Sequence, residues 1–487
     1  MFITIGVLLK IKFAVILLFL SFSSFAIKSY QISMPIMPKS VLPIKQWHYY
    51  NYFISKYLFR NLVSIDNKGL LRGDIAKRWS VSKDGQKYTF ELKKNVFYQG
   101  YQITAWDIEY SLKRYFHKSN KSSIKSYLLN AFGVRDNESK KINFDELIKV
   151  NNSLSISLNL KKAYSPLLYV LSLPTFGIIP KTMKEGDYQF SVSGNVKGKF
   201  ARDAKVDFKE GKLSIISKEE SFIISKSDQV SNYDVVLGPS EEDIEGLDKE
   251  KYSIFSLNGL AINHLYFNCN KEYNLSAKQR RYLSFIIQGV FDNAKENYLL
   301  KRQKTFLPNG VMPRSYFKDH KVSDPTPVSF KRKIILKLRV EHFSKEIIDN
   351  LRKTLLEKKI DSEITLVAGK DYVKNLQGRE YHLISGASVG VFPDPDGFLS
   401  ILEKSNQYKF TNCSTESFMK DLSEYRNTNN IRERLKGYSK SFTNFESQDW
   451  IIQSFSINPI IATKLKKKAS RYSYKFIPSL GDIVNED

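Results

Sequence analysis

The chain has 487 residues, of which 42% are hydrophobic and 26% are charged. This length has room for two or three domains with substantial cores, and the composition excludes a disordered or fibrous protein. The formal net charge is +26, but the basic residues are spread along the chain without a recognition helix, an RNA-binding motif or a long basic tail. The charge therefore predicts a solvated surface and no nucleic-acid partner.

The N-terminus has the three parts of a secretory signal peptide. Lys10 and Lys12 precede an apolar run within residues 13–26, and small residues end this run at Ala26, where we expect cleavage. The alternative is an uncleaved anchor that also uses residues 1–9, but both lysines would then lie near mid-membrane, at a few kcal/mol each. No cysteine stands directly after the run, so we expect no lipoprotein attachment and a mature chain that is free in the periplasm.

The mature chain keeps two cysteines, Cys269 and Cys413. An oxidising compartment permits a disulfide between them. Two separate buried thiols fit the sequence equally well, so both arrangements stay open.

Strand and helix patterns alternate along the chain, which predicts an α/β protein. Residues 88–92 alternate apolar and polar side chains, as a half-buried strand does. Thr104 and Asp107 have the spacing of a capping box at the start of a helix, and Ser276 and Gln279 repeat that spacing further on. Both helices carry an apolar stripe on one face.

The C-terminal half predicts a unit of strand, helix and strand. Residues 334–340 form the first predicted strand, residues 344–358 a helix with one apolar stripe, and residues 364–367 and 381–384 two further strands. The region 191–260 is rich in Lys, Ser and Gly with short strand patterns, and we expect a mixed-sheet connector there.

The motifs of common enzymes are missing from the sequence. The six histidines share no metal-ligand spacing, and there is neither a Gly-x-Ser-x-Gly elbow nor a phosphate-binding glycine loop. Asp394-Pro-Asp396-Gly397 is similar to a calcium loop, but its glycine comes two positions early and later ligands are missing. We therefore expect no metal, no cofactor and no enzymatic activity; a secreted hydrolase would need a catalytic pair that the sequence does not reveal.

Three segments carry a family pattern. Residues 73–108 contain, in order, Ala, Trp, Asp-Gly, Tyr-Thr-Phe-x-Leu and Thr-Ala-x-Asp, with Gln99 where a second Asp is usual. Residues 265–310 have a strand, an Arg- and Asp-bearing helix and a Pro-Gly turn, although the usual Arg-Gln-Ala is not kept. The third segment, residues 391–399, reads Val-Phe-Pro-Asp-Pro-Asp-Gly-Phe-Leu. Together they resemble the family 5 extracellular solute-binding proteins, which are peptide, dipeptide and nickel receptors of ABC transporters.

The resemblance implies a two-lobed periplasmic binding protein of type II, cluster C-like, with mixed sheets and an extra subdomain. Such lobes close over a ligand about a hinge. The resemblance divides the chain as follows: signal peptide 1–26; split lobe I 27–60, 177–260 and 456–487; extra subdomain 61–176; lobe II 261–455.

The third segment departs from the family where a ligand would bind. Many peptide-binding members have an Asp at its start that pairs with the α-amino group of the peptide; here that position is Val391, and the Trp often found three residues earlier is Ser388. A buried ammonium without a carboxylate is costly. Either Asp394 or Asp396 replaces the missing Asp, or the ligand has no free amine there; both aspartates also fit a turn. The candidate ligand-binding residues are Val391, Phe392, Asp394, Asp396 and Trp47, with core packing as the alternative for Trp47.

The resemblance thus implies a monomeric periplasmic receptor that delivers a small molecule, a peptide or another oligomeric solute to the permease of an ABC importer. The alternative is a degenerate relative that acts as an envelope interaction partner or ligand sensor without transport. The changes at Val391, Ser388 and 191–194 favour this alternative.

Overall fold

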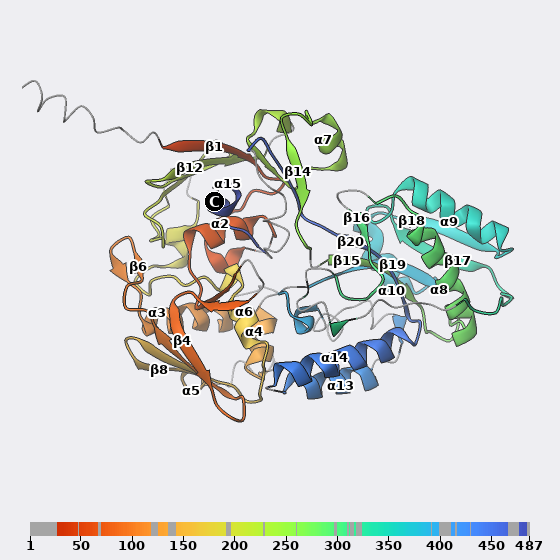
Figure 1. Cartoon of the computed structure of the whole chain (residues 1–487), viewed down its shortest axis with the longest axis horizontal. Helices are drawn as coiled ribbons and strands as arrows, with labels where there is room; N and C mark the ends of the chain where they lie inside the picture. Colours follow the sequence, from red (N-terminus) through yellow and green to blue (C-terminus); the bar gives the residue numbers. More distant parts are fainter. Residues whose placement is uncertain are drawn as a thin grey trace, which may run out of the picture.

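The computed structural model has the α/β architecture expected, with two β-sheets at the centres of two halves and a smaller sheet beside the first (Figure 1). Among the residues described, no helix is long and apolar enough to cross a membrane. The predicted signal peptide lies outside the described residues, which are 27–46, 48–66, 70–117, 125–134, 143–190, 196–226, 229–259, 261–296, 300–308, 311, 316–317, 324–390, 392–398, 411–413, 416–428, 430–465 and 477–484.

The first half is built on a seven-stranded sheet of order β10-β11-β12-β1-β13-β21-β14. Strand β1 runs parallel to β12 and β13, and the other pairs are antiparallel. The region 191–260, expected as a connector, supplies five of these strands, so it is a main part of this half. The strands are β1 (Lys28–Ser33), β10 (Lys205–Lys209), β11 (Lys212–Ile216), β12 (Glu220–Ser225), β13 (Val235–Leu237), β14 (Ser253–Ser256) and β21 (Ile460–Thr463).

The second half is built on a six-stranded sheet of order β16-β20-β15-β19-β17-β18. The expected strand–helix–strand unit consists of β17, α9 (Lys345–Glu357) and β18, and its two strands are parallel. The strand expected at 381–384 instead spans Leu383–Val389, because both of its faces are largely buried. The strands are β15 (Ala261–Phe267), β16 (Leu300–Arg302), β17 (Ile334–Arg339), β18 (Ser362–Val367), β19 (Leu383–Val389) and β20 (Ile451–Ile457).

A four-stranded sheet of order β4-β5-β9-β8 lies below the first half in Figure 1. Its strands are β4 (Ala76–Val81), β5 (Lys87–Leu92), β8 (Ile148–Asn152) and β9 (Ser155–Asn159). Two hairpins accompany it, β2–β3 (Val63–Ile65, Leu71–Gly73) and β6–β7 (Phe97–Tyr98, Tyr101–Gln102). Gln99, in place of the family's Asp, has a φ of 46° in the turn of the second hairpin, a conformation that Asp and Asn adopt more readily.

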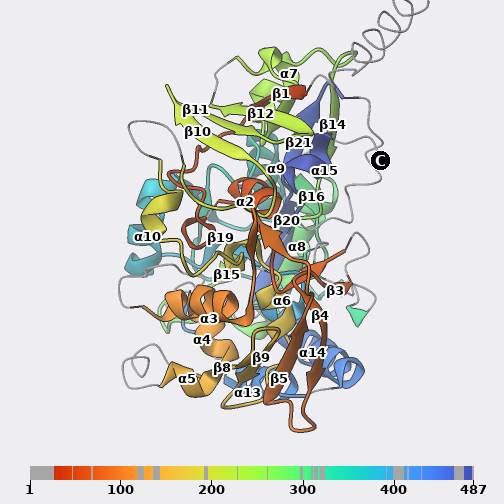
Figure 2. The ribbon, with the colours of Figure 1, turned by 90° about the vertical axis from the view of Figure 1, so that its left-hand side faces the viewer.

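Helices complete the three parts, and two of them begin with the predicted capping boxes. Thr104 and Asp107 cap α3, and Ser276 and Gln279 cap α8. In Figures 1 and 2, α13 and α14 lie at the lower end of the molecule, beside the four-stranded sheet. The helices are α2 (Asn51–Leu58), α3 (Ala105–Lys113), α4 (Lys125–Ala131), α5 (Phe144–Leu147), α6 (Leu167–Leu171), α7 (Glu241–Gly246), α8 (Ala277–Asp292), α9 (Lys345–Glu357), α10 (Tyr372–Gly378), α13 (Glu416–Arg426), α14 (Ile431–Glu446) and α15 (Leu480–Val484).

The apolar cores follow the sheets. One cluster of buried side chains extends from the seven-stranded to the four-stranded sheet, and two others belong to the six-stranded half. Strand β15 alternates between these two, because Ile262 and Tyr266 belong to one cluster and Leu265 and Phe267 to the other. This is the period-two alternation of a strand buried on both faces.

The chain crosses between the halves in two adjacent segments, after β14 and after β20. The Leu257 N–H donates to the Pro459 carbonyl at 2.8 Å, and the Gly259 N–H donates to Asn458 Oδ1 at 3.3 Å. A Cβ atom on Gly259 would lie 2.3 Å from the Ile457 carbonyl oxygen. Glycine at this position therefore lets the two crossing segments approach closely.

Candidate ligand-binding junction

A cavity lies at the carboxyl ends of the parallel strands of the first half. It has a volume of about 670 Å³, and its lining includes Ser33 and Met34 after β1 and Gly238 after β13. In Figure 1, β1 runs from the left edge toward the middle of the molecule. Open α/β sheets bind their ligands beyond the carboxyl ends of parallel strands, so this edge is one wall of the candidate site.

The segment before α2 packs on the same edge. A Cβ atom on Gly238 would lie 2.5 Å from the ring of Tyr50, and Gly238 has a φ of +64°. The Tyr50 hydroxyl donates to the Ile460 carbonyl at 3.2 Å and accepts from the Ile460 N–H at 3.1 Å. These contacts hold the start of α2 beside the cavity. Trp47, predicted to contact ligand, lies outside the described residues.

Three aromatic side chains, Tyr52, Tyr127 and Phe392, form what we call the aromatic wall. The rings of Tyr127 and Phe392 meet edge to face, with centroids 6.0 Å apart. Burial raises the pKa of Tyr52, and the neighbouring Tyr127 raises it further. Phe392 is fully buried, whereas Tyr52 and Tyr127 are half-buried and keep part of their surface exposed. The wall joins α2, α4 and the loop after β19, which come from three distant parts of the chain.

Asp394, in the loop of residues 392–398, is bound within the six-stranded half. Arg434 of α14 donates to Asp394 Oδ1 at 2.8 Å and to Oδ2 at 2.5 Å. Burial acts to lower the pKa of Arg434, but the charge and hydrogen bonds of Asp394 keep it above the ordinary value. A Cβ atom on Gly397 would lie 2.4 Å from the Phe392 carbonyl oxygen, so this tight loop requires glycine there.

Asp396 joins the two halves. Its Oδ1 accepts from Arg426 Nε of α13 at 2.6 Å, and its Oδ2 accepts from the Tyr164 hydroxyl at 2.5 Å. Tyr164 follows β9 of the four-stranded sheet, and the Ser165 hydroxyl donates to the Arg426 carbonyl at 3.4 Å. The carboxylate of Asp396 is therefore a bridge between the four-stranded part and the helices of the second half.

The structure brings three of the predicted residues, Phe392, Asp394 and Asp396, into one loop; Val391 lies outside the described residues. Ser388, where the family often has Trp, is buried and lies 2.8 Å from the Tyr266 hydroxyl. No sequence pattern marks Tyr127, Tyr164, Arg426 or Arg434 as residues of this site. Two buried aspartates require cationic partners, but their identity was hidden among many Arg and Lys residues.

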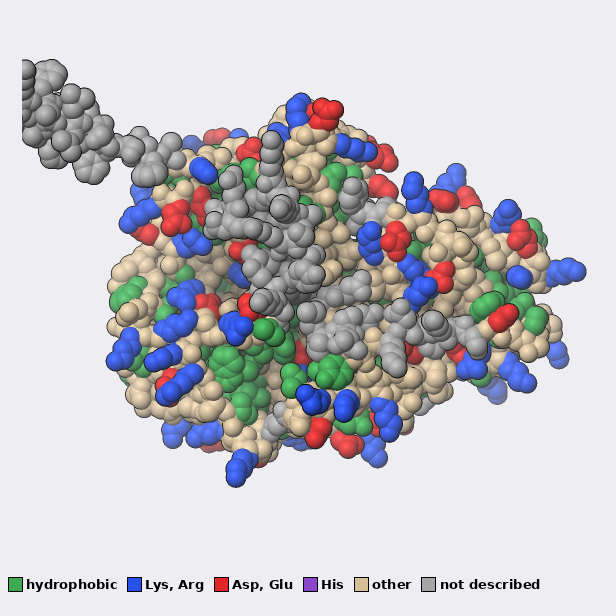
Figure 3. Space-filling view, in the orientation of Figure 1, with side chains coloured by type: hydrophobic (Ala, Val, Ile, Leu, Met, Phe, Trp, Pro, Cys, Tyr) green, Lys and Arg blue, Asp and Glu red, His purple; other side chains and the backbone are tan. Residues whose placement is uncertain are grey.

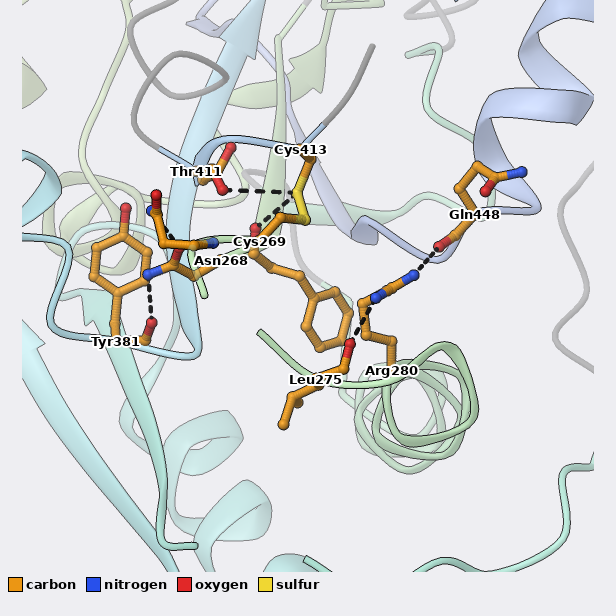
Figure 4. The surroundings of a disulfide bond; sticks show 10 residues. Asn268, Cys269, Leu275, Arg280, Tyr381, Thr411, Cys413 and Gln448 are labelled. Carbon is orange, nitrogen blue, oxygen red and sulfur yellow. Dashed lines mark hydrogen bonds between the residues drawn. A yellow bond between two sulfur atoms is a disulfide. The ribbon is translucent and has the colours of Figure 1, made fainter. Parts of the chain in front are cut away.

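Cys269 and Cys413 form a disulfide in the structure, with Cα atoms 5.0 Å apart. The Cys269 N–H donates to the Thr411 carbonyl at 2.7 Å, and Asn268 next to it donates to the Tyr381 carbonyl at 2.8 Å (Figure 4). The bond ties the end of β15 to the chain before α13, the helix that carries Arg426. The disulfide thereby helps to hold α13, and with it the Arg426 that binds Asp396, in place within the second half.

The described residues carry charged side chains of both signs but no cluster of metal ligands. Across the described ranges, no group of three or more His, Cys, Asp or Glu side chains could hold a metal ion. On the face in Figure 3, basic side chains are spread widely and mixed with acidic ones. This distribution matches the solvated surface expected from the sequence.

Comparisons with known proteins define the class. Residues 71–200 match the model for bacterial extracellular solute-binding proteins, family 5 Middle. A dipeptide-binding protein of Lactococcus lactis subsp. cremoris (strain MG1363) is 31% identical over 152 residues, which cover 31% of this chain and 28% of that protein. Dipeptide-binding protein DppE of Bacillus subtilis (strain 168) is 27% identical over 186 residues, covering 37% and 31%. The matched stretch thus spans less than a third of either relative.

Solved structures extend the similarity to nearly the whole chain. MppA, a periplasmic murein tripeptide binding protein in its unliganded open form, has a TM-score of 0.73 at 16% identity and covers 93% of this chain and 96% of its own. Haemophilus influenzae OppA in complex with RPPGFSPFR has a TM-score of 0.67 at 14% identity, with coverage of 94% and 98%. NikA from Brucella suis with Fe(III)-EDTA has a TM-score of 0.70 at 16% identity, covering 92% and 98%.

Through residues 71–200 the chain is similar to the family 5 extracellular solute-binding proteins. Its fold is that of the type II periplasmic binding proteins.

Proposed function

We propose that this protein is a periplasmic receptor that delivers a peptide or another oligomeric solute to an ABC importer. The observation that carries the proposal is the junction of the two halves: there the aromatic wall joins α2 and α4 to Phe392, and the same loop binds Tyr164 after β9 and Arg426 of α13 through Asp396. The family match and the names of the dipeptide-binding relatives support it.

We propose lobe boundaries that follow the sheets. Split lobe I would comprise 27–60, 177–260 and 456–487, with 61–176 as the extra subdomain and 261–455 as lobe II. Strand β20 of the second sheet continues to Ile457, two residues beyond the end of lobe II at 455. The two crossing segments around Gly259 and Asn458 would then be the hinge. Closing over ligand at such a hinge is the event that a membrane partner recognises.

The proposal assigns the site and the cell compartment as follows. Phe392 of the aromatic wall, with Val391 and Trp47 from the sequence, are the proposed ligand-contacting residues, while Asp394 and Asp396 hold the loop in place. Residues 1–26 act as a signal peptide that is cleaved near Ala26, and the mature chain works in the periplasm as a monomer.

Ligand-induced stabilisation of the mature protein tests the receptor role. A ligand present at 100 times its Kd stabilises the folded state by about 2.7 kcal/mol, and we expect a clear rise in Tm with a suitable peptide. Replacing Tyr52 of the wall by Ala should abolish the rise, whereas Tyr273→Ala, a change near the disulfide and remote from the wall, should not. A screen of peptides, sugars and metals without any shift at millimolar concentration would contradict the proposal. Binding without uptake by cells would favour the sensor alternative.

A further inference from the structure

The two negative charges of the loop of residues 392–398 are each paired with a positive charge. Its two carboxylates, Asp394 and Asp396, face two guanidinium groups, Arg434 and Arg426. The side chains of Asp394 and Arg434 are 2% and 1% exposed, and those of Asp396 and Arg426 are 1% and 13% exposed. The four groups therefore form two ion pairs that are almost entirely withdrawn from solvent.

Every carboxylate oxygen of this loop already accepts a hydrogen bond. Asp394 receives both donors of Arg434 and, at 2.9 Å, the N–H of Asp396. Asp396 receives Arg426 on one oxygen and Tyr164 on the other. A ligand ammonium could bind either carboxylate only by competing with donors already in place, Arg434 at Asp394 and Arg426 or Tyr164 at Asp396. At Asp394 the displaced guanidinium of Arg434, whose side chain is 1% exposed, would lose the carboxylate that balances its charge, which costs several kcal/mol in such pairs.

The side chains that pack next to these pairs are aromatic. Phe392 precedes Asp394 by two residues and packs against Tyr127, and Tyr127 neighbours Tyr52. On the other side, Tyr169 lies close enough to the pair for its charges to act: burial raises the pKa of Tyr169 to about 12, with Asp394 adding to the rise and Arg434 opposing it. Aromatic faces of this kind bind apolar or planar neutral groups through contact area and stacking.

We infer that the ligand presents an uncharged, apolar or planar end to the aromatic wall and carries no free ammonium at the 392–398 loop. The ligand class that this chemistry selects is an oligomer with a blocked amino end, such as an N-acylated peptide. The inference rests on the proposed receptor function and narrows its substrate class. It also decides between the two possibilities that Val391 left open, because neither Asp394 nor Asp396 is available as an amine partner.

A competition between blocked and free peptides tests this inference. The mature protein is incubated with a random tetrapeptide library in which each sequence is present in equal amounts with a free and with an N-acetylated amino end. The retained peptides are identified by mass spectrometry. We expect at least tenfold enrichment of acetylated forms, because a desolvated ammonium finds no carboxylate at the wall. Equal retention of both forms, or enrichment of free ones, overturns the inference and leaves the receptor function standing. Retention of neither form overturns peptide binding itself.

A designed carboxylate supplies the matched control. Tyr127 is half-buried, so Tyr127→Glu should fold and would place a negative charge on the wall, while Tyr127→Gln has similar size without the charge. Tyr127→Glu should move the retained peptides at least tenfold toward free amines, and Tyr127→Gln should not. If both variants, shown to be folded by circular dichroism, retain the same peptides as each other, the wall does not contact the amino end and the inference is wrong.

Discussion

The two halves of the molecule bury different kinds of groups. The first half combines its seven-stranded sheet with the four-stranded sheet in one large, mainly apolar cluster. The second half buries the Asp394–Arg434 pair, the disulfide and the histidines His264, His342 and His382 around its six-stranded sheet. The first half also buries Asp107 and Glu220, but the buried ion pair and the histidines with lowered pKa values belong to the second half. The first half contributes the strand ends and most of the aromatic wall.

The largest expected effect comes from breaking the buried ion pair. Arg434→Met leaves the carboxylate of Asp394 buried without a cation, and removing one partner of such a pair destabilises a protein by about 3–5 kcal/mol. Urea unfolding of the mature protein measures the loss. The double variant Asp394→Leu with Arg434→Met is the control, since it removes both charges and should recover most of the stability. A loss below about 1 kcal/mol for the single variant would show that the pair is not buried as described.

A second contrast is the acid sensitivity of the second half. His264 is fully buried, its ring stacks on Phe306 at 4.8 Å, and neither ring nitrogen has a hydrogen-bond partner among the described residues. Burial, together with the nearby His342, lowers the pKa of His264 to about 3. The unfolded chain therefore takes up this proton first, and stability falls as the pH drops below about 6.5, by about 2 kcal/mol at pH 5.

His264→Phe removes this titration and keeps an aromatic ring against Phe306. We expect the stability lost between pH 8 and pH 5 to shrink by about 2 kcal/mol in this variant, while the rest of the loss remains because burial also lowers the pKa of His342 and of His382 to about 4. Urea unfolding at both pH values measures this loss. At pH 8 the histidine is neutral, so a difference between variant and wild type at that pH reports packing alone. An unchanged loss would mean that His264 is hydrated or paired in solution.

Local features of this fold could be predicted from the sequence, and distant contacts could not. The capping boxes at Thr104 and Ser276 depend on residues three positions apart, and both are present in the structure. The ion pair of Asp394 joins residues 40 positions apart, and the bond of Asp396 to Tyr164 joins residues 232 apart. Sequence alone identified the two aspartates as unusual, but their partners are chosen by how α14 and the segment after β9 pack, which no local pattern records.

The smallest expected change in stability is at Asp396, whose carboxylate contacts both halves. Tyr164→Phe removes the hydroxyl that donates to Asp396 at 2.5 Å and leaves the ion pair with Arg426. We expect a loss of about 1–2 kcal/mol, but also faster hydrogen exchange in residues 392–398 and α13, because the bridge between the halves is lost.

Tyr115→Phe is the matched control for that bridge. The Tyr115 hydroxyl donates to the Thr175 carbonyl within the cluster of the first half, so its removal should cost similar stability without faster exchange at the loop or in α13. Equal exchange in both variants would mean that Asp396 acts only inside the second half, as Asp394 does. A selective increase in Tyr164→Phe would instead show that a single buried carboxylate couples the four-stranded part to the helices opposite it. In that case the position of the aromatic wall, and with it the ligand selectivity, depends on a contact between the halves rather than on either half alone.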